Sequence, residues 1–563
     1  MKIHSGYKRL KGSEHTHPKG HRVLEPTRGS ELITVTLILR RRSGGSKLRD
    51  LKDFPAKSGA LREPVSRVQF AADHGADLKE LEQVAAFALS KNLEVVESNQ
   101  ARRSVLVRGT VTNMNNAFGV TLSDYQYPLG KYRGHMGQAK LPTAIARTVE
   151  AIIGLDNRRI NAKPHSTIRR RNQRDPVNTR PLTPQQVALL HEFPPGDGAG
   201  QTIGIYEMAT ADSLNPNGPP VYAGYTLQDV KNTISGFGGA LRVPTLVDVA
   251  VDGVGNSGLN DGETLLDITI AGAIAQGATI AVYFTGGETQ NILHALQRMI
   301  YPGDGDPIPT IISISYGWGP DDSKTGFTRA EFTQFGKLFQ DAANLYITVL
   351  VSTGDNGAFI ESAIRAQASY PATEPMVIAC GGTTVGNISA TAFDEYVWND
   401  TGAAGPGATG GGVSGRFAVP AYQAGAGVPT QNVTRRPGRG IPDVAGNASE
   451  NSGYMQNAAG FPPQSVGGTS AVAPLYAGLI AIINANLGVS VGFINPTLYT
   501  LAGSAFRDIV GPPGPLDNSF SGVTGYPVGV GWDACTGLGS VMGVALQDGL
   551  QAACAGSRRP AAV

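Results

Sequence analysis

The pattern of apolar and polar residues predicts an α+β unit in the first part of the chain. The expected order is a strand, two helices, two paired strands and two more helices, at residues 32–39, 65–75 and 77–92, 93–98 and 103–109, 110–120 and 142–155. With a closing strand, this order is typical of a compact α+β (ferredoxin-like) sandwich.

The second part of the chain carries short apolar runs that alternate with helical stretches. These runs are TIGIYEM, TIAVYF, TIISISYG, YITVLVST and MVIACGG. Continuous β-branched runs of this kind predict an α/β fold, a parallel sheet covered by helices on both faces. Catalytic groups in such sheets lie at the carboxyl ends of the strands, which makes SISYGWG and VSTGDNG candidate site segments.

A change of composition separates the two parts. Residues 161–181 are rich in charge, proline and polar residues, which predicts an exposed linker open to cleavage. We therefore expect a flexible segment at 1–30, a folded unit at 31–160, the linker at 161–181 and a larger unit at 182–563.

Charge is distributed unevenly along the 563 residues. Residues 1–181 carry a net charge of +17 and residues 182–563 a net charge of −15. A nucleic-acid-binding arm would give such a pattern, but the basic residues are interleaved with an apolar pattern that predicts a folded unit. A partnership between a basic and an acidic part of the same chain explains the asymmetry better.

Cysteine content and hydropathy exclude other classes. Three cysteines, Cys380, Cys535 and Cys554, cannot form a disulfide framework or a metal knuckle, and at most one pair could be oxidised. The N-terminus has no apolar core of the length that a signal peptide needs, and we expect no membrane-spanning run.

The stretch GGTSAVAP places Ser470 at the start of a predicted helix. An oxygen there meets the positive end of the helix dipole and free backbone amides, which suits a nucleophile. The same position suits an ordinary helix cap, so both interpretations stand.

A serine nucleophile needs a base, and the sequence favours a carboxylate over a histidine. The two histidines after residue 181, His191 and His294, lie among apolar neighbours and are expected to have packing or surface roles. Glu263 and Asp267 are four residues apart on one face of a predicted helix, where two carboxyls can share a proton. The alternative is a pair of solvated helix acids.

Asp355, in VSTGDNG, follows an apolar strand. When protonated it could donate a hydrogen bond to an oxyanion. An aspartate in such a sequence is also common as a turn residue.

Six ordered motifs together resemble the sedolisin family of serine-carboxyl peptidases, most closely its kumamolisin-type members. They are DGETLLDI, SISYGWG, VSTGDNG, TGGGVS, PDVAGNA and GGTSAVAP, and the resemblance covers about residues 30–545. It implies a subtilisin-like parallel sheet preceded by a pro-domain. It also implies acid-active endopeptidase chemistry with Ser470 as nucleophile, Glu263 as general base, Asp267 in support and Asp355 as the oxyanion-hole acid.

The resemblance further implies one structural calcium ion near the carboxyl end. Its ligands would be the carboxylates of Asp508 and Asp533 and the carbonyls of Ile509, Gly529 and Gly531. These oxygen donors would fix a long loop.

Two positions depart from the pattern of some relatives. Those relatives extend the acid network with a glutamate after the first strand of the mature enzyme and a tryptophan in the SIS motif. Glu207 matches the glutamate, but Tyr316 replaces the tryptophan. The tyrosine hydroxyl could still form a hydrogen bond. Some relatives also carry an acid just before the proline of the motif that reads SYPA in this chain, and that acid favours basic substrate residues. Ser369 and Tyr370 stand there instead, so we do not expect a preference for basic substrate residues.

The resemblance gives the basic N-terminal part a role as a pro-domain that covers the acidic catalytic part until acid weakens the attraction. Expected partners are protein or peptide substrates and the chain's own pro-domain, with no nucleic acid and no membrane. We expect an extracellular monomer after maturation.

The main alternative is a catalytically silent subtilisin-fold binding protein, which should lack one of the four catalytic residues. A Ser-His-Asp hydrolase would need a histidine in a glycine-flanked motif at the start of a helix, and none is present.

Overall fold

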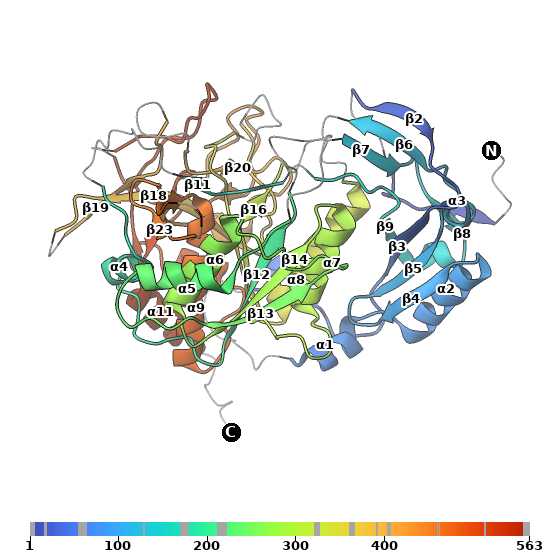
Figure 1. The fold of residues 1–563 in the computed structure, drawn as a ribbon, viewed down its shortest axis with the longest axis horizontal. Helices are drawn as coiled ribbons and strands as arrows, with labels where there is room; N and C mark the ends of the chain where they lie inside the picture. Colours follow the sequence, from blue (N-terminus) through green and yellow to red (C-terminus); the bar gives the residue numbers. More distant parts are fainter. Residues whose placement is uncertain are drawn as a thin grey trace.

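A computed structural model shows two folded parts, and residues 162–168, which follow the first part in sequence, pair with strands of the larger one (Figure 1). It describes residues 6–15, 20–54, 65–127, 130–160, 162–168, 179–210, 222–319, 327–359, 366–389, 392–401, 407–458, 460, 462–511 and 514–555. The N-terminal part, blue in Figure 1, lies beside the larger part formed by the rest of the chain.

The larger part is built on a sheet whose strands run in the order β13-β14-β12-β15-β17-β18-β22-β26-β25, with β19 paired to β18. Neighbours from β13 to β26 are parallel, and β25 and β19 are antiparallel additions. The strands are β12 (Thr202–Met208), β13 (Thr245–Ala250), β14 (Thr279–Thr285), β15 (Ile311–Ile314), β17 (Thr348–Ser352), β18 (Ile378–Gly386), β19 (Asp394–Val397), β22 (Val444–Asn447), β25 (Phe506–Arg507) and β26 (Ser540–Val541). The five strands predicted from apolar runs are confirmed.

Alternate residues of each strand face two separate cores. On β14, Ile280, Val282 and Phe284 pack into one core, and Ala281 and Tyr283 pack into the other. Both faces are covered, which explains why these strands are apolar without interruption.

Helices cover both faces of the sheet (Figure 1). The first core includes α5 (Leu227–Gly236), α6 (Glu263–Ile274) and α9 (Val472–Leu487), with α4 (Pro184–Leu190), α10 (Asn495–Thr500) and α11 (Gly543–Ala555) around it. The second core contains α7 (Thr289–Ile300) and α8 (Arg329–Asn344). This is the expected subtilisin-like arrangement.

Short elements complete the larger part. They are β10 (Lys163–Pro164), β11 (Thr167–Ile168), β16 (Tyr316–Gly317), β20 (Gly412–Val413), β21 (Gly440–Ile441), β23 (Tyr454–Gln456), β24 (Gln464–Gly467) and the 3-10 turns η3 (Ala421–Gln423) and η4 (Thr469–Ala471). Several of them lie at the carboxyl ends of the parallel strands, around the predicted site segments.

The N-terminal part is an α+β unit with a four-stranded antiparallel sheet in the order β4-β5-β3-β9. Its elements are β1 (Tyr7–Arg9), β2 (Arg22–Pro26), β3 (Leu32–Leu39), η1 (Leu51–Asp53), α1 (Arg67–His74), α2 (Leu78–Ser90), β4 (Glu94–Asn99), β5 (Ser104–Thr110), α3 (Val111–Phe118), β6 (Ser123–Tyr127), β7 (Gly130–Gly134), β8 (Lys140–Pro142), η2 (Ile145–Arg147) and β9 (Val149–Ile153). One sheet face packs on α2 and α3 around its own core.

Two sequence predictions for this part are wrong. Residues 142–155 were expected to be helical, but Val149–Ile153 forms strand β9, because its β-branched residues pair with β3. The expected flexible segment 1–30 contains strands β1 and β2, which pair with β8 and β6 and so gain backbone partners.

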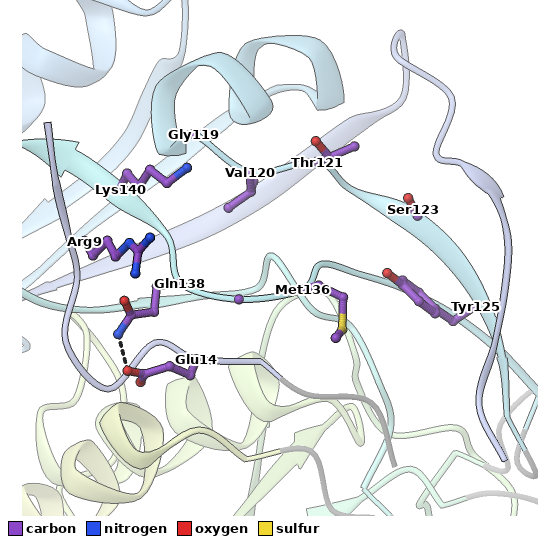
Figure 2. Close-up of a pocket in the computed structure, with 11 residues that line it drawn as sticks. Arg9, Glu14, Gly119, Val120, Thr121, Ser123, Tyr125, Met136, Gln138 and Lys140 are labelled. Atoms are coloured by element: carbon purple, nitrogen blue, oxygen red, sulfur yellow. Dashed lines mark hydrogen bonds between the residues drawn. The ribbon is translucent and has the colours of Figure 1, made fainter. Parts of the chain in front are cut away.

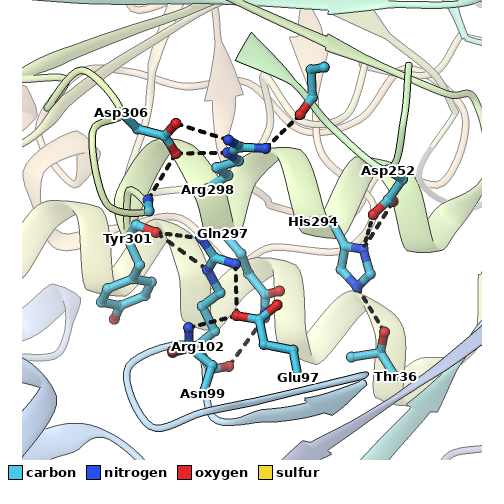
Figure 3. A network of polar contacts seen from close by, with 12 residues as sticks. Thr36, Glu97, Asn99, Arg102, Asp252, His294, Gln297, Arg298, Tyr301 and Asp306 are labelled. Carbon is cyan, nitrogen blue, oxygen red and sulfur yellow. Dashed lines mark hydrogen bonds and ion pairs between the residues drawn. The ribbon is translucent and has the colours of Figure 1, made fainter. Parts of the chain in front are cut away.

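The other face of the N-terminal sheet docks on α7 and α8. Ile38, Ala151 and Ile153 belong to the same core as these two helices. Figure 3 shows polar contacts across the same boundary: Arg102 donates to the carbonyl of Tyr301 at 3.0 Å, and Thr36 Oγ1 lies 2.7 Å from His294 Nε2. Basic side chains thus meet the C-terminal carbonyls of α7, where positive charge is favourable.

Among the described residues, one helical stretch, Thr469–Leu487, is long and apolar enough to cross a membrane; an 18-residue window of it has a mean hydropathy of 1.5, and 83% of that window is buried inside the molecule. Burial to this extent is typical of a core helix. Cys380 and Cys535 are buried as well, and no disulfide occurs among the described residues.

An open pocket of about 790 Å³ lies on the N-terminal part between β1, β8 and the turn after α3 (Figure 2). Arg9, Lys140 and the hydrogen-bonded pair Glu14 and Gln138 line it. None of the predicted site residues belongs to this pocket.

Candidate active site

Ser470 lies in η4, directly before α9, and is fully buried. Its side chain caps neither η4 nor α9, so the helix-cap interpretation is wrong. Its backbone amide donates to the carbonyl oxygen of His165 at 2.8 Å. Its hydroxyl donates to the carbonyl oxygen of Ser315 at 3.3 Å.

Glu263 and Asp267 occupy successive turns at the start of α6. Their exposed fractions are 3% and 0%, which rules out solvated helix acids. Asp267 Oδ2 accepts a hydrogen bond from Ser315 Oγ at 2.7 Å. Burial, followed by repulsion from Asp267, raises the pKa of Glu263 well above its usual range, and the hydroxyls of Ser166 and Ser470 offset part of this rise. Burial also raises the pKa of Asp267.

A third carboxyl, Glu207 at the end of β12, extends this cluster. Tyr316 OH donates to Glu207 Oε2 at 2.9 Å, so the tyrosine does supply the hydrogen bond that the sequence allowed. Burial, then repulsion from Asp267, raises the pKa of Glu207 well above its usual range. Like charges this close cannot all ionise, and the cluster therefore keeps protons to a higher pH than isolated carboxyls would.

Asp355 follows β17 and faces the same point as Ser470. Its Oδ1 accepts from the amide and the hydroxyl of Thr469 at 2.8 Å and 2.9 Å. Its Oδ2 is buried and has no hydrogen-bond partner among the described residues. Burial raises the pKa of Asp355 to about 7, although the two bonds from Thr469 oppose the rise. A protonated Oδ2 can donate a hydrogen bond.

Gly468 shows where Asp355 and the His165 carbonyl converge. A Cβ atom on Gly468 would lie 2.2 Å from His165 O and 2.5 Å from Asp355 Oδ2, and the backbone has a φ of +103°. Both oxygens therefore lie beside the same bare Cα. Together with the Ser470 amide, this arrangement can stabilise negative charge on the carbonyl oxygen.

The described part of the linker, residues 162–168, lies across this site as an extended strand. Lys163–Pro164 pairs antiparallel with Tyr316–Gly317, and Thr167–Ile168 pairs antiparallel with Val466–Gly467. The segment SISYGWG, a candidate site segment, thus offers an edge to a peptide strand. Within the motif TGGGVS, Gly412–Val413 pairs with Gly440–Ile441.

The two histidines considered as bases lie elsewhere. His191 Nε2 is 3.2 Å from Glu395 Oε2 in the first core, and His294 lies on α7 between Thr36 and Asp252. Their predicted packing and surface roles are confirmed. The sequence motifs assigned no role to Ser315 or Thr469, although both residues stand inside them. Thr469 directly precedes Ser470, which was an available signal, but Ser315 has no predicted catalytic residue beside it in sequence.

The predicted calcium ligands come together in the loops around β25 and β26. The amide of Gly531 donates to Asp508 Oδ2 at 2.8 Å, and the amide of Gly529 donates to Asp533 Oδ2 at 3.2 Å. The carbonyls of Ile509, Gly529 and Gly531 accept no hydrogen bond from the described residues. Carbonyl oxygens that accept no hydrogen bond are suitable ligands for a hard cation such as calcium. In the described parts of the chain, however, no group of three acidic, histidine or cysteine side chains forms a metal site.

The site brings together a buried serine, a cluster of buried carboxyls and an extended segment of the chain itself. This is the arrangement of a peptidase that carries its own pro-segment. Residues 19–158 match the family model for the pro-kumamolisin activation domain. The chain is 38% identical over 541 residues to kumamolisin of Bacillus sp. (strain MN-32), covering 93% of each chain. It is 31% identical to tripeptidyl-peptidase sed5 of Aspergillus fumigatus, covering 95% of this chain and 96% of that protein.

The solved structure of Pseudomonas sedolisin, a serine-carboxyl proteinase complexed with pseudo-iodotyrostatin, matches with a TM-score of 0.54 at 25% identity. The match covers 67% of this chain and 99% of that one. The chain belongs to the sedolisin family of serine-type peptidases, as a kumamolisin-type pro-enzyme.

Proposed function

We propose that this pro-enzyme is an acid-active endopeptidase that works through Ser470, Glu263 and Asp267, with Asp355 completing the oxyanion hole. The observation that carries the proposal is the carbonyl of His165, which accepts from the Ser470 amide at 2.8 Å beside Asp355 Oδ2, an atom with no hydrogen-bond partner in the described parts of the chain. A peptide carbonyl held there is positioned for attack.

In this mechanism the Ser470 hydroxyl turns from Ser315 toward Glu263, which accepts its proton. The serine oxygen then adds to the carbonyl carbon, and the oxyanion is held by the Ser470 amide and a protonated Asp355. The bond between this carbon and the amide nitrogen then breaks, Glu263 returns the proton to the leaving amine, and water hydrolyses the resulting acyl-enzyme ester. Asp267, anchored by Ser315, holds the second proton of the carboxyl pair and keeps Glu263 in position.

The same reasoning predicts when the enzyme works. Asp355 donates only while it is protonated, and burial raises its pKa to about 7 under the docked linker. The donor is therefore present below this value and is lost as the pH rises through it. Glu263 can act as a base once the coupled carboxyl pair has lost one of its two protons, whereas a histidine would be charged at acid pH.

We also propose a structural role for calcium and an extracellular location. When bound, calcium would supply charge that holds the loop together, with Asp508 and Asp533 as carboxylate ligands and Ile509, Gly529 and Gly531 as carbonyl ligands. The mature enzyme would act as a monomer on protein or peptide substrates. Family membership and the proposed acid chemistry support secretion.

Cleavage of an unfolded protein from pH 3 to 8 tests the proposal, with wild type and Ser470→Ala compared. We expect hydrolysis on the acid side only and a loss of at least about 10³-fold in Ser470→Ala. The full-length Ser470→Ala chain should remain intact at acid pH. A rate maximum near pH 7, or equal rates for the two proteins, would contradict the carboxylate mechanism.

A further inference from the structure

We propose that residues 6–15 form an N-terminal clasp that holds the pro-domain on helix α8 and sets how long the pro-enzyme stays latent. The clasp touches neither Ser470 nor the carboxyl cluster in the contacts of the described residues. It therefore acts on activation, which rests on the proposed function, and leaves the cleavage of peptide bonds unchanged.

The clasp is fastened along its length to the N-terminal part of the molecule. Tyr7–Arg9 pairs antiparallel with Lys140–Pro142, and the buried side chain of Leu10 belongs to the core of this part. Ser13 Oγ accepts a hydrogen bond from the amide of Ala139 at 3.1 Å. These contacts fix the position of the clasp, so that any bond it makes with the larger part ties the two parts together.

The last residues of the clasp are fastened in the same way. His15 and Gly137 exchange two backbone hydrogen bonds of 3.1 Å. The side chain of His15 is buried, with its Nδ1 3.4 Å from Asp156 Oδ2. Figure 2 shows the neighbouring hydrogen bond between Glu14 and Gln138. The clasp is thus held on both sides of Gly12.

Gly12 makes the contact with the larger part. Its carbonyl oxygen accepts from the amide of Ala330 at 3.0 Å. Ala330 lies in the first turn of α8, where backbone amides have no partner within the helix. Thr328 Oγ1 accepts from the amide of Glu331 at 3.2 Å. The helix's own cap therefore satisfies one of these amides, and the clasp satisfies another.

Gly12 fits against α8 because it has no side chain. Its φ of +84° lies in the left-handed region that favours glycine. A Cβ atom on Gly12 would lie 3.4 Å from the nitrogen and 3.6 Å from the Cβ of Ala330. The two backbones approach closely here, and a branched side chain at residue 12 would push the clasp away from the helix.

The opposite end of α8 is held by basic residues of the pro-domain. Arg41 pairs with Asp341 at 2.6 Å, and the backbone of Arg49 is bonded to the side chain of Asn344. A carbonyl acceptor at the N-terminal end and cations at the C-terminal end both suit the helix dipole. The pro-domain thus grips α8 at its two ends, and both contacts must open before it can leave.

Gly12→Val tests the clasp in the full-length chain. At pH 4 it should shorten the lag before casein hydrolysis by at least about 2-fold, because a hydrogen bond of the clasp is lost. The final rate after processing should equal that of wild type, since the clasp leaves with the pro-domain. Gly20→Val is the matched control: Gly20 has a φ of +97°, and a Cβ atom there would meet nothing within 4 Å. Its lag should match that of wild type.

Hydrogen exchange reports on the contact without catalysis. In full-length Ser470→Ala, the start of α8 should exchange at least about 2-fold faster with Gly12→Val than with Gly20→Val, because the Ala330 amide loses its acceptor. Unchanged protection of β3 and β5 would show that the N-terminal part of the variant is folded.

A disulfide tests the same contact in the opposite direction. In the double variant Gly12→Cys/Ala330→Cys the two Cβ positions are 3.6 Å apart, which suits a disulfide. After treatment with oxidised glutathione, casein hydrolysis at pH 4 should be at least about 10-fold slower than in wild type, because the linked pro-domain stays at high local concentration. A phosphine reductant should restore activation. Gly12→Cys alone should not be inhibited.

Two results would overturn the clasp: a Gly12→Val chain with the wild-type lag and wild-type exchange, or a cross-linked chain that activates at the wild-type rate. Absence of casein hydrolysis in every protein, wild type included, would instead overturn the proposed function. The exchange measurement would then still decide whether the clasp holds α8.

Discussion

At the residue scale, this site depends on carboxyl groups that hold protons because they are buried. Asp355 donates nothing when ionised, and its Oδ2 is the atom that faces the His165 carbonyl. Its raised pKa means that its contribution to the docked state is fully present below the ordinary carboxyl value and is lost as the pH rises toward about 7.

Asp355→Asn tests whether Asp355 acts as a hydrogen-bond donor, because an asparagine side chain can donate without being protonated. The amide oxygen can still accept from Thr469, and the amide nitrogen donates at every pH. We expect self-processing within about 10-fold of wild type at pH 4 and an alkaline limb shifted to higher pH. Asp355→Ala should lose about 10²- to 10³-fold. The measurement is the rate of processing against pH; an asparagine variant as slow as the alanine variant would contradict the assigned role.

At the element scale, a few short strands and loops do the positioning. Strand β16 receives the linker on one side of Ser470, and β24 receives it on the other. The loop before β26 brings the proposed calcium ligands to the edge of the sheet, next to β25. The stability of this loop should therefore depend on the ion.

Removal of calcium tests the loop. Chelation of full-length Ser470→Ala should lower its melting temperature, and Asp508→Asn should lower it similarly in the presence of calcium, because the carboxylate charge is lost. The exposed Asp548 on α11 is the matched control, and Asp548→Asn should respond to the chelator as the parent does. Calorimetry gives the values. Equal melting temperatures with and without chelator would contradict a structural role for calcium.

At the scale of the whole molecule, a basic N-terminal part is held against an acidic catalytic part by a few specific contacts. Arginines reach across the boundary to α7 and α8: Arg67 donates to the carbonyl of Ile300 at 2.8 Å, Arg41 pairs with Asp341 at 2.6 Å, and Arg102 donates to Tyr301. These contacts show where basic residues of the N-terminal part meet the larger part.

Arg102→Ala should loosen this surface. The substitution removes its bonds to the Tyr301 carbonyl, which we expect to cost about 1–3 kcal/mol of stability in full-length Ser470→Ala. In the otherwise wild-type chain it should shorten the lag before activation at pH 4. Arg108, paired with Glu94 on the surface of the N-terminal part, is the control. If Arg102→Ala and Arg108→Ala unfold at the same temperature, the contact does not hold the two parts together.

Much of this architecture was predictable because it is local. Apolar β-branched runs predicted β12, β14, β15, β17 and β18, and the spacing of Glu263 and Asp267 predicted one helical face. The prediction failed at Val149–Ile153, where strand pairing overrode a helical pattern. Periodicity reports which residues share a face, but a partner strand distant in sequence decides whether a short apolar run is a strand.

The sequence by itself determined the fold class and the family, since both are written in local periodicity and in ordered motifs, and it predicted the residues proposed to carry the chemistry. Only the tertiary structure decided that Glu263 and Asp267 are buried, and that Tyr316 donates to Glu207. It also decided which linker residue meets Ser470. His165 and Ser470 are separated by some 300 residues, and burial and contact between such groups arise only when the sheet, helices and linker pack together.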